Sequence, residues 1–289
     1  MSGPAALVVG YSWEDGAPVL RIRRDQPGVW RLEGSVCFRV RPGRRCTGYG
    51  GVDGFHPCPE RASLAGGHRC DACAARDAFR VCMICDGFRC GRLSPAVERH
   101  CRRTRVLYLA CFGADALKVG TAIHPRRDQR IVEQGPLAAA RVAMGDGRII
   151  KQMETTLSRA GFTETMRRSR KLALLDGGMD AEEATSRVRT AAAELRDVIP
   201  RAMHVLLHPP EFVRMPPLAV ESRQIRVNAL PIQEGTVIEG QVVGAVGHVL
   251  FLQDDAGKFA LDLGSLKGRV LEPDPDGPRR RPTVQLGLF

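Results

Sequence analysis

The chain has no apolar run that approaches the length of a membrane-spanning helix. Its longest such runs, for example residues 106–112, are far shorter than the roughly 20 apolar residues that a bilayer requires. It also lacks a basic segment ahead of an apolar one at its start, where the acidic Glu14 comes early, so we expect no secretory signal peptide. These absences predict a cytoplasmic protein.

Internal repeats are absent as well, and at 289 residues the chain suits two or three domains that each bury a core. The sequence contains ten cysteines, eight of them between residues 46 and 101. Without a secretory signal, Cys-x2-Cys spacing favours metal ligation over disulfides. Long apolar runs are scarce in this segment, so we expect metal to replace part of its core.

The patterning predicts an α/β protein in five regions. Strands are expected at 18–22, 29–40, 106–112, 117–121, 236–243, 248–253 and 258–263, and helices at 126–133, 148–160 and 180–199, whereas 137–144 fits a strand or a helix. Asp180 is the expected N-cap of the last helix. The predicted regions are a β-rich N-terminal segment (1–45), a cysteine-rich zinc-binding domain (46–104), an α/β domain with an extra helix (105–208), a small antiparallel β-barrel or sheet (209–272) that begins with a proline-rich connector, and a flexible tail (273–289).

A first group of cysteines has the spacing of a structural zinc site. Cys46, Cys58, Cys70 and Cys73 follow a Cys-x11-Cys-x11-Cys-x2-Cys pattern. A Cys-x2-Cys turn directs two thiolates at one ion, and two more distant sulfurs complete the tetrahedron. Four protein ligands leave no open coordination position, which favours a structural role over a catalytic one.

A second group offers three spaced sulfurs and a choice of fourth ligand. Cys82, Cys85 and Cys90 would be joined by Cys101 or by His100. The sequence leaves open whether one or two zinc ions bind. Two further cysteines, Cys37 in a predicted strand and Cys111 in an apolar run, are expected to be small core residues.

Positive charge is concentrated in one quarter of the chain. Residues 98–171 contain sixteen Arg and Lys against seven Asp and Glu, a net charge of +9 out of the +11 of the whole chain. Such a concentration attracts phosphate backbones through counterion release. We therefore expect nucleic acid, DNA or RNA, as the partner. The expected contacts are Arg126, Arg127, Arg130, Arg167, Arg168, Arg170 and Lys171.

Part of the chain resembles the GIY-YIG nuclease core. The resemblance lies in VLYLACFGADALKVGTA, followed by a basic helix and then KQMETTL, where Val106-Leu107-Tyr108 and Lys118-Val119-Gly120 take the places of the two tripeptides. A longer set of motifs, RRCTG, PCPE, RCDAC, LYLACFG, LKVG, EQG and SRK, resembles a zinc-containing family catalogued as domain of unknown function 2797, over roughly residues 35–270.

The GIY-YIG resemblance implies a catalytic set. Tyr108 matches the tyrosine that activates or positions water, Arg130 or Arg127 the phosphate-stabilising arginine, and Glu154 the ligand of one divalent cation, Mg or Mn. These are the parts that single-metal phosphodiester cleavage requires. The second tyrosine of the family pattern is Lys118 here, so cleavage could have been lost while the binding face remained.

Three functions therefore stay open. The first is a zinc-stabilised nucleic-acid-binding protein with a GIY-YIG-like core, which either only binds or also cleaves as a divalent-metal-dependent endonuclease. The second is a non-nuclease enzyme that uses the same pocket on a small or carrier-bound phosphate-containing substrate. The third is a zinc-bearing protein adaptor. Glu154 also has a simpler interpretation, an ion pair with Lys151 on the same helix.

Overall fold

The computed structural model describes residues 4–91, 93–167, 170, 171, 174, 178–221 and 228–273. The chain divides into two compact units, one made of residues 1–49, 55–76 and 227–289 and the other of residues 50–54 and 77–226. Residues 274–289 of the predicted tail, and the predicted contact Arg168, lie outside the described residues.

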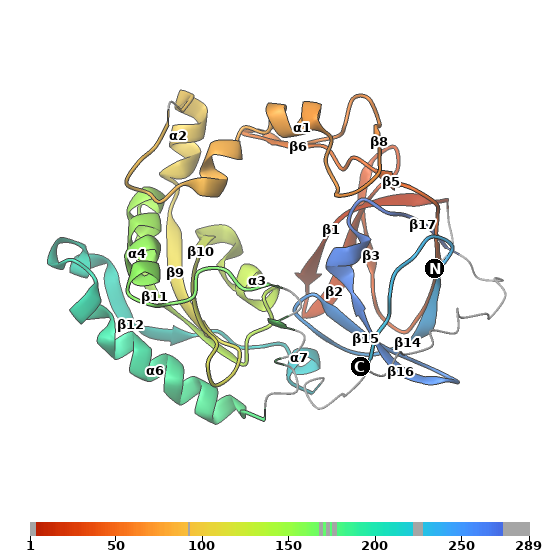
Figure 1. Cartoon of the computed structure of the whole chain (residues 1–289). Helices are drawn as coiled ribbons and strands as arrows, with labels where there is room; N and C mark the ends of the chain where they lie inside the picture. The colour runs from red at the N-terminus through yellow and green to blue at the C-terminus, as the bar shows by residue number, and fades with distance from the viewer. Residues whose placement is uncertain are drawn as a thin grey trace. The chain divides into compact units, whose positions relative to one another are not determined.

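The first unit contains a nine-stranded sheet that combines both ends of the chain. Its strand order is β13-β16-β15-β14-β4-β17-β1-β2-β3, so strands from the red and the blue end of the chain lie together in Figure 1. The strands are β1 (Ala6–Glu14), β2 (Ala17–Arg23), β3 (Pro27–Arg31), β4 (Ser35–Val40), β13 (Asn228–Ala229), β14 (Val237–Val246), β15 (Val249–Asp254), β16 (Gly257–Asp262) and β17 (Val270–Pro273).

Pairing across the chain joins two regions that the sequence analysis placed in separate domains. β4 lies between β14 and β17, and β17 also pairs with β1, all antiparallel. Buried side chains from both ends, including Phe38, Leu20 and Phe251, are fully enclosed. Within the described residues the strand order ends at β13 and β3 without closing on itself, so the predicted C-terminal β region is part of an open sheet and not a barrel.

Short elements carry the first cysteine group of this unit. β5 (Arg44–Arg45) pairs with β8 (Ser63–Leu64), and α1 (Asp71–Arg76) follows. The hairpin strands β6 (Tyr49–Gly51) and β7 (Gly54–His56) lie where the chain passes between the units.

The second unit is built on a four-stranded antiparallel sheet with the order β10-β9-β11-β12. Its strands are β9 (Arg105–Cys111), β10 (Leu117–Ile123), β11 (Ala138–Gly145) and β12 (Leu207–Phe212), and its helices are α2 (Pro95–Cys101), α3 (Arg127–Val132), α4 (Gly147–Arg159), α6 (Ala181–Val198) and α7 (Pro217–Glu221). Short 3₁₀ turns cover Arg80–Ile84, His124–Arg126 and Arg201–Leu206, and in the first unit Leu263–Leu266.

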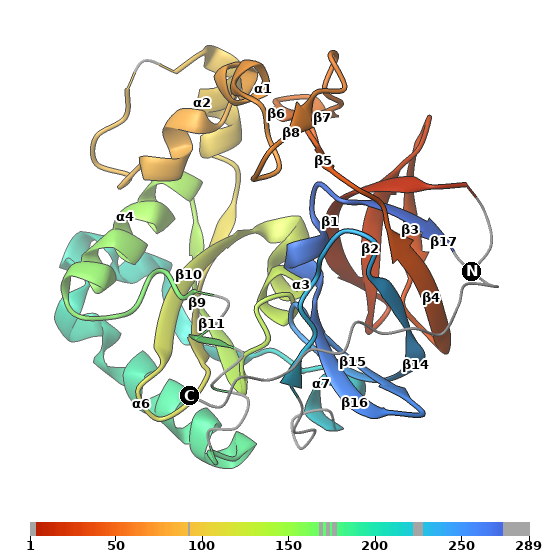
Figure 2. The ribbon, with the colours of Figure 1, turned by 45° about the vertical axis from the view of Figure 1, so that its right-hand side comes forward.

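Alternating residues of β9 supply two cores. Leu107 and Leu109 pack with Ile150 and Met153 of α4 and with Leu195 of α6, so both helices cover one face of the sheet (Figure 2). The next residues along the strand, such as Tyr108, pack on the other face with Ile131 of α3. This period of two is what a strand buried on both faces produces.

Most elements of this unit follow the sequence prediction. Residues 137–144, which fitted a strand or a helix, form β11, and Asp180 caps α6 by accepting a hydrogen bond from the Glu183 amide at 2.7 Å. The prediction of a proline-rich connector is wrong at Pro209 and Pro210, because both residues lie in strand β12. A proline cannot donate to a ladder, but β12 is an edge strand and needs donors on one side only.

None of the described helices combines the length and the apolar character that crossing a bilayer would need.

The packing of α6 predicts a loss of stability on truncation at its buried face. Leu195 is 2% exposed within the second-unit core, so Leu195→Ala should cost about 2–5 kcal/mol of unfolding free energy. Glu194→Ala, at an exposed position of the same helix, should change it by no more than about 0.5 kcal/mol. Denaturant unfolding measures both, and equal effects would contradict this core assignment.

Candidate functional site

The first cysteine group forms a compact sulfur cluster, as its spacing predicted. The Sγ atoms of Cys46, Cys58, Cys70 and Cys73 all lie within 4.8 Å of one another, and those of Cys58 and Cys70 are 3.9 Å apart. Zn–S bonds of about 2.3 Å place tetrahedral sulfurs about 3.8 Å apart. Three of the residues are buried and Cys70 is partly buried. This donor set fits a structural zinc ion.

Local backbone geometry brings these sulfurs together. Cys70 directly precedes α1 and Cys73 lies in it, so one helical turn aligns the Cys-x2-Cys pair. The amide of Cys46 donates to the Ala62 carbonyl at 2.8 Å, and the amide of Cys70 donates to Cys46 Sγ at 3.3 Å. Gly48 has φ +108°, and a Cβ there would lie 2.0 Å from the His56 carbonyl oxygen, so only glycine fits.

The protonation of these thiols reflects their crowding. Burial raises the pKa of Cys73, and hydrogen bonds that its thiol donates to the neighbouring cysteine sulfurs raise it further. For Cys58, burial is opposed by hydrogen bonds from the Ala62 amide and from other thiols, which lower the pKa to about 7. A divalent cation stabilises thiolates that would otherwise repel one another.

The second cysteine group is more open. The sulfurs of Cys85 and Cys90 lie 3.9 Å apart. Among the described residues, however, only the first group brings three or more ligand atoms within 4.8 Å of one another. Of the two remaining cysteines, Cys111 is fully buried in the second-unit core, as predicted, and Cys37 is partly buried on β4.

Tyr108, the first predicted catalytic residue, is buried in the sheet beneath Gly120. The two residues are register partners, and a Cβ at position 120 would lie 2.4 Å from the tyrosine oxygen. Burial raises the pKa of Tyr108 to about 12, while Arg130 lowers it and Glu154 raises it. The phenol is therefore neutral near pH 7 and suited to donate a hydrogen bond rather than to act as a base.

The edge of β10 gathers the other predicted catalytic groups into a charged network. Lys118 is 8% exposed and donates to the carbonyl oxygens of Val119, at 3.2 Å, and of Glu164. Lys151 donates to Glu154 Oε2 at 2.7 Å and to the Glu164 carboxylate. Burial lowers the pKa of Lys118, and burial raises that of Glu154 against the opposing effect of Lys151.

This network does not fit the predicted Mg or Mn ion at Glu154. Hard divalent cations take about six oxygen ligands. The buried Glu154 carboxylate already forms an ion pair with the Lys151 ammonium, and the charge of Lys118 also lowers its pKa. The second nearby carboxylate, Glu164, is bonded to the same Lys151. The ammonium occupies the space between the two carboxylates, so no metal-dependent step follows from this arrangement.

The predicted arginines separate into two sets. Arg126 and Arg130 both form ion pairs with the buried Glu133, at 2.8 and 3.6 Å. The charge of Arg130 also lowers the pKa of Tyr108. Arg127, the alternative to Arg130, instead places its guanidinium on His124, 2.9 Å from Nε2.

Two of the later basic residues contact the segment between β9 and β10 and the residues that follow α3. Arg170 donates to the Asp115 carbonyl at 3.3 Å, Lys171 donates to Gln134 Oε1 at 2.6 Å, and Arg167 is exposed. Burial and the charges of Lys118 and Arg130 lower the pKa of Lys171 to about 7.

Two adjoining pockets flank this charged edge. The arginine pocket, of about 510 Å³, is lined by His100, Arg103, Arg105, Thr121, Ala122, Ile123, Pro125, Arg126 and Arg130. The glutamate pocket, of about 270 Å³, is lined by Phe79, Cys82, Cys85, Gly87, His100, Cys101, Arg105, Thr121, Gly147, Arg148, Lys151 and Glu154. Three residues belong to both pockets, so one ligand could reach from one into the other.

Sequence reasoning did not identify several residues of this site. Lys151 was visible as the partner of Glu154 but was not predicted to belong to the site. Arg103 and Arg105 were counted in the basic segment without a role, and Glu164 gave no signal. Its position beside Lys118 comes from a bridge between Lys118 and Thr163, a contact between distant residues that no local pattern encodes.

Comparison with known proteins identifies one family. A family model described as "Protein of unknown function (DUF2797)" matches residues 67–270, which is most of the chain. No curated protein and no solved structure matches the chain.

The first cysteine cluster predicts a zinc-dependent fold in its segment. Cys73→Ser should remove one equivalent of bound zinc and lower the melting temperature, because the binding energy of a structural zinc is also folding energy. Elemental analysis and thermal denaturation measure both effects. Cys37→Ser, at a partly buried position of β4, is the matched control and should keep its zinc. Zinc retained in full by Cys73→Ser would argue against this site.

Proposed function

The chain belongs to the DUF2797 family, a family of unknown function, and we propose that it binds nucleic acid through the arginine pocket. The observation that carries the proposal is the convergence of Arg103, Arg105, Arg126 and Arg130 on one cavity. Guanidinium groups bind phosphate oxygens in pairs of charge-assisted hydrogen bonds. Four of them around a single pocket favour a ligand that carries more than one phosphate.

The pocket keeps much of its positive charge. Glu133 lies beside Arg126 and Arg130, but Arg103 and Arg105 have no ion pair with a carboxylate among the described residues. Burial lowers the pKa of His100, and the positive charges of Arg105 and Arg103 lower it further. A field that disfavours a proton on His100 favours an anion at the same place.

The aromatic lining of the neighbouring glutamate pocket favours an unpaired nucleotide as the part of the ligand that enters this pocket. Phe79 and His100 line it, with ring centroids 4.6 Å apart and planes inclined by 48°. An aromatic wall beside a basic groove is how proteins hold single strands, because every base has a face that can stack. We therefore favour single-stranded DNA or RNA, or an unpaired end, over a continuous duplex.

Cleavage remains the alternative activity at this site. Tyr108, Lys118, Arg130 and Glu154 influence one another electrostatically around the edge of β10, which suits phosphodiester chemistry. The bond between Lys151 and Glu154 argues against a metal-dependent version of it. A small phosphorylated substrate or a protein partner are the remaining rivals, and the tests below separate them.

Charge reversal in the arginine pocket tests binding. Arg103→Glu and Arg130→Glu should each weaken binding of a fluorescent oligouridine about tenfold or more and make it less dependent on salt. Arg187→Glu, at an exposed position of α6, changes the net charge equally and is the matched control. Fluorescence anisotropy at several salt concentrations gives the affinities, with a duplex of the same length for comparison.

Two outcomes would contradict the proposal. An equal loss in all three variants would mean attraction by net charge alone, without a site. No binding of any oligonucleotide by the zinc-loaded protein would leave the small phosphorylated substrate and the protein adaptor.

A substitution at Glu154 separates binding from metal-dependent cleavage. Glu154→Gln should bind the oligonucleotide as well as the parent or better, because it removes a negative charge from the pocket that the unpaired nucleotide enters. We expect the parent protein to bind without Mg or Mn, in buffer free of chelators that would strip zinc. Gel analysis that finds Mg- or Mn-dependent cutting by the parent, lost in Glu154→Gln, would establish the nuclease instead.

A further inference from the structure

We propose that Cys82, Cys85, Cys90 and Cys101 bind a second zinc ion, independently of nucleic-acid binding. All four residues line one small cavity of about 20 Å³ in the second unit. That volume suits a single ion or water and is too small for an organic ligand. Thiolate ligands in a cluster of four select zinc among the common divalent ions.

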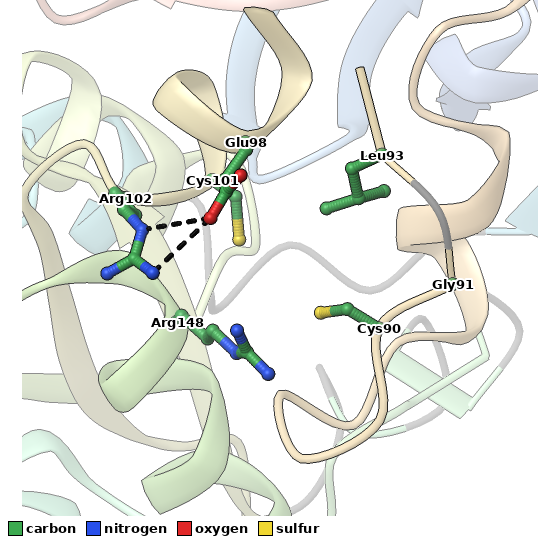
Figure 3. Close-up of a pocket in the computed structure, with 7 residues that line it drawn as sticks. All are labelled: Cys90, Gly91, Leu93, Glu98, Cys101, Arg102 and Arg148. Atoms are coloured by element: carbon green, nitrogen blue, oxygen red, sulfur yellow. Dashed lines mark hydrogen bonds and ion pairs between the residues drawn. The ribbon is translucent and has the colours of Figure 1, made fainter. Parts of the chain in front are cut away.

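The distance between the sulfurs of Cys85 and Cys90 fits a shared zinc ion. Cys85 Sγ and Cys90 Sγ are 3.9 Å apart, which is close to the separation of about 3.8 Å between sulfurs on one zinc. It is far beyond the S–S bond of about 2.05 Å in a disulfide. Figure 3 shows that the Cys90 and Cys101 sulfurs both point into the space between α2 and the loop that carries Cys90.

The loop around Cys85 has the form that presents a thiolate to a metal. Cys82 lies in the 3₁₀ turn Arg80–Ile84 and Cys85 follows it directly, so the turn aligns the Cys-x2-Cys pair. The Gly87 amide donates to Cys85 Sγ at 3.2 Å. Gly87 has a φ of +79°, a backbone conformation that glycine adopts without strain and that turns the chain back toward the sulfur. An N–H donor stabilises negative charge on the sulfur.

The surroundings select Cys101 over His100 as the fourth ligand. His100 lines the two larger pockets and packs its ring on Phe79, but it does not line the small cavity. Cys101 does, and it ends α2 immediately before the turn that leads to β9. This geometry resolves the choice that the sequence had left open.

Helix α4 supports both halves of the proposed ligand set. Gln152 Nε2 and Arg148 Nε donate to the Gly87 carbonyl at 2.9 and 3.1 Å. At the start of the helix, a Cβ on Gly147 would lie 2.2 Å from the Cys101 carbonyl oxygen, so α4 contacts the end of α2 directly. Since Cys82, Cys85 and Cys101 also form a wall of the glutamate pocket, the ion would lie next to the site that contains Glu154.

The test is the zinc stoichiometry of the full chain. Elemental analysis of protein purified without chelator should find two zinc ions per chain. Cys90→Ser and Cys101→Ser should each contain one, while His100→Ala should keep two. Cys37→Ser, outside both groups, is the matched control and should also keep two.

A second measurement guards against variants that fail to fold. Titration of the metal-free parent with Co²⁺ should produce thiolate-to-cobalt absorption that rises up to two equivalents, with half the amplitude in Cys101→Ser. One zinc and one cobalt equivalent in the parent would overturn the proposal. So would two zinc ions retained by folded Cys101→Ser, or a native mass two hydrogens lower with Cys85 and Cys90 joined in a disulfide.

Discussion

The antiparallel register of β9 with its two neighbours is the constraint on which the candidate site depends. It places Tyr108 opposite Gly120 on one side and Arg141 on the other, and Lys118 opposite Ala110. A shift by one residue would turn each of these side chains to the other face of the sheet. Because a Cβ at position 120 would collide with the tyrosine ring, this pairing also requires glycine at that position.

The charge balance around β10 decides which ligands suit the site. Its buried carboxylates, Glu133 and Glu154, are both paired with cations of the chain itself. A further divalent cation would compete with those partners, whereas an anion would meet arginines with unused donors. Because both carboxylates are paired in this way, the arrangement does not fit the Mg or Mn ion that the GIY-YIG resemblance implied. The lysine in the position of the second tyrosine adds to this positive charge.

The first cysteine cluster lies in a segment of the chain in which buried apolar residues are scarce. The buried part around the first group consists of Cys46, Cys58 and Cys73 with a few partly buried neighbours such as Tyr49 and Leu64. So small an apolar cluster contributes little burial energy, and coordination of a metal by the four cysteines would supply the stability that burial does not. The two groups adjoin in sequence, yet they belong to different units of the structure.

Several features were determined by the sequence alone because they depend on neighbours along the chain. The Cys-x2-Cys pair at Cys70, the N-cap of α6 at Asp180 and the strand β9 all follow from spacing within a few residues. The family resemblance, which the family model supports over residues 67–270, likewise rested on short motifs.

Only the tertiary structure decided how distant segments meet. It joined the strands from the two ends of the chain in one sheet and set Lys151 between Glu154 and Glu164. It also gathered Arg103 and Arg105 with Arg126, just before α3, and Arg130, within α3. The physical reason is that pairing register, burial and charge at these places are set by contacts between residues far apart in sequence, and local periodicity carries no information about them.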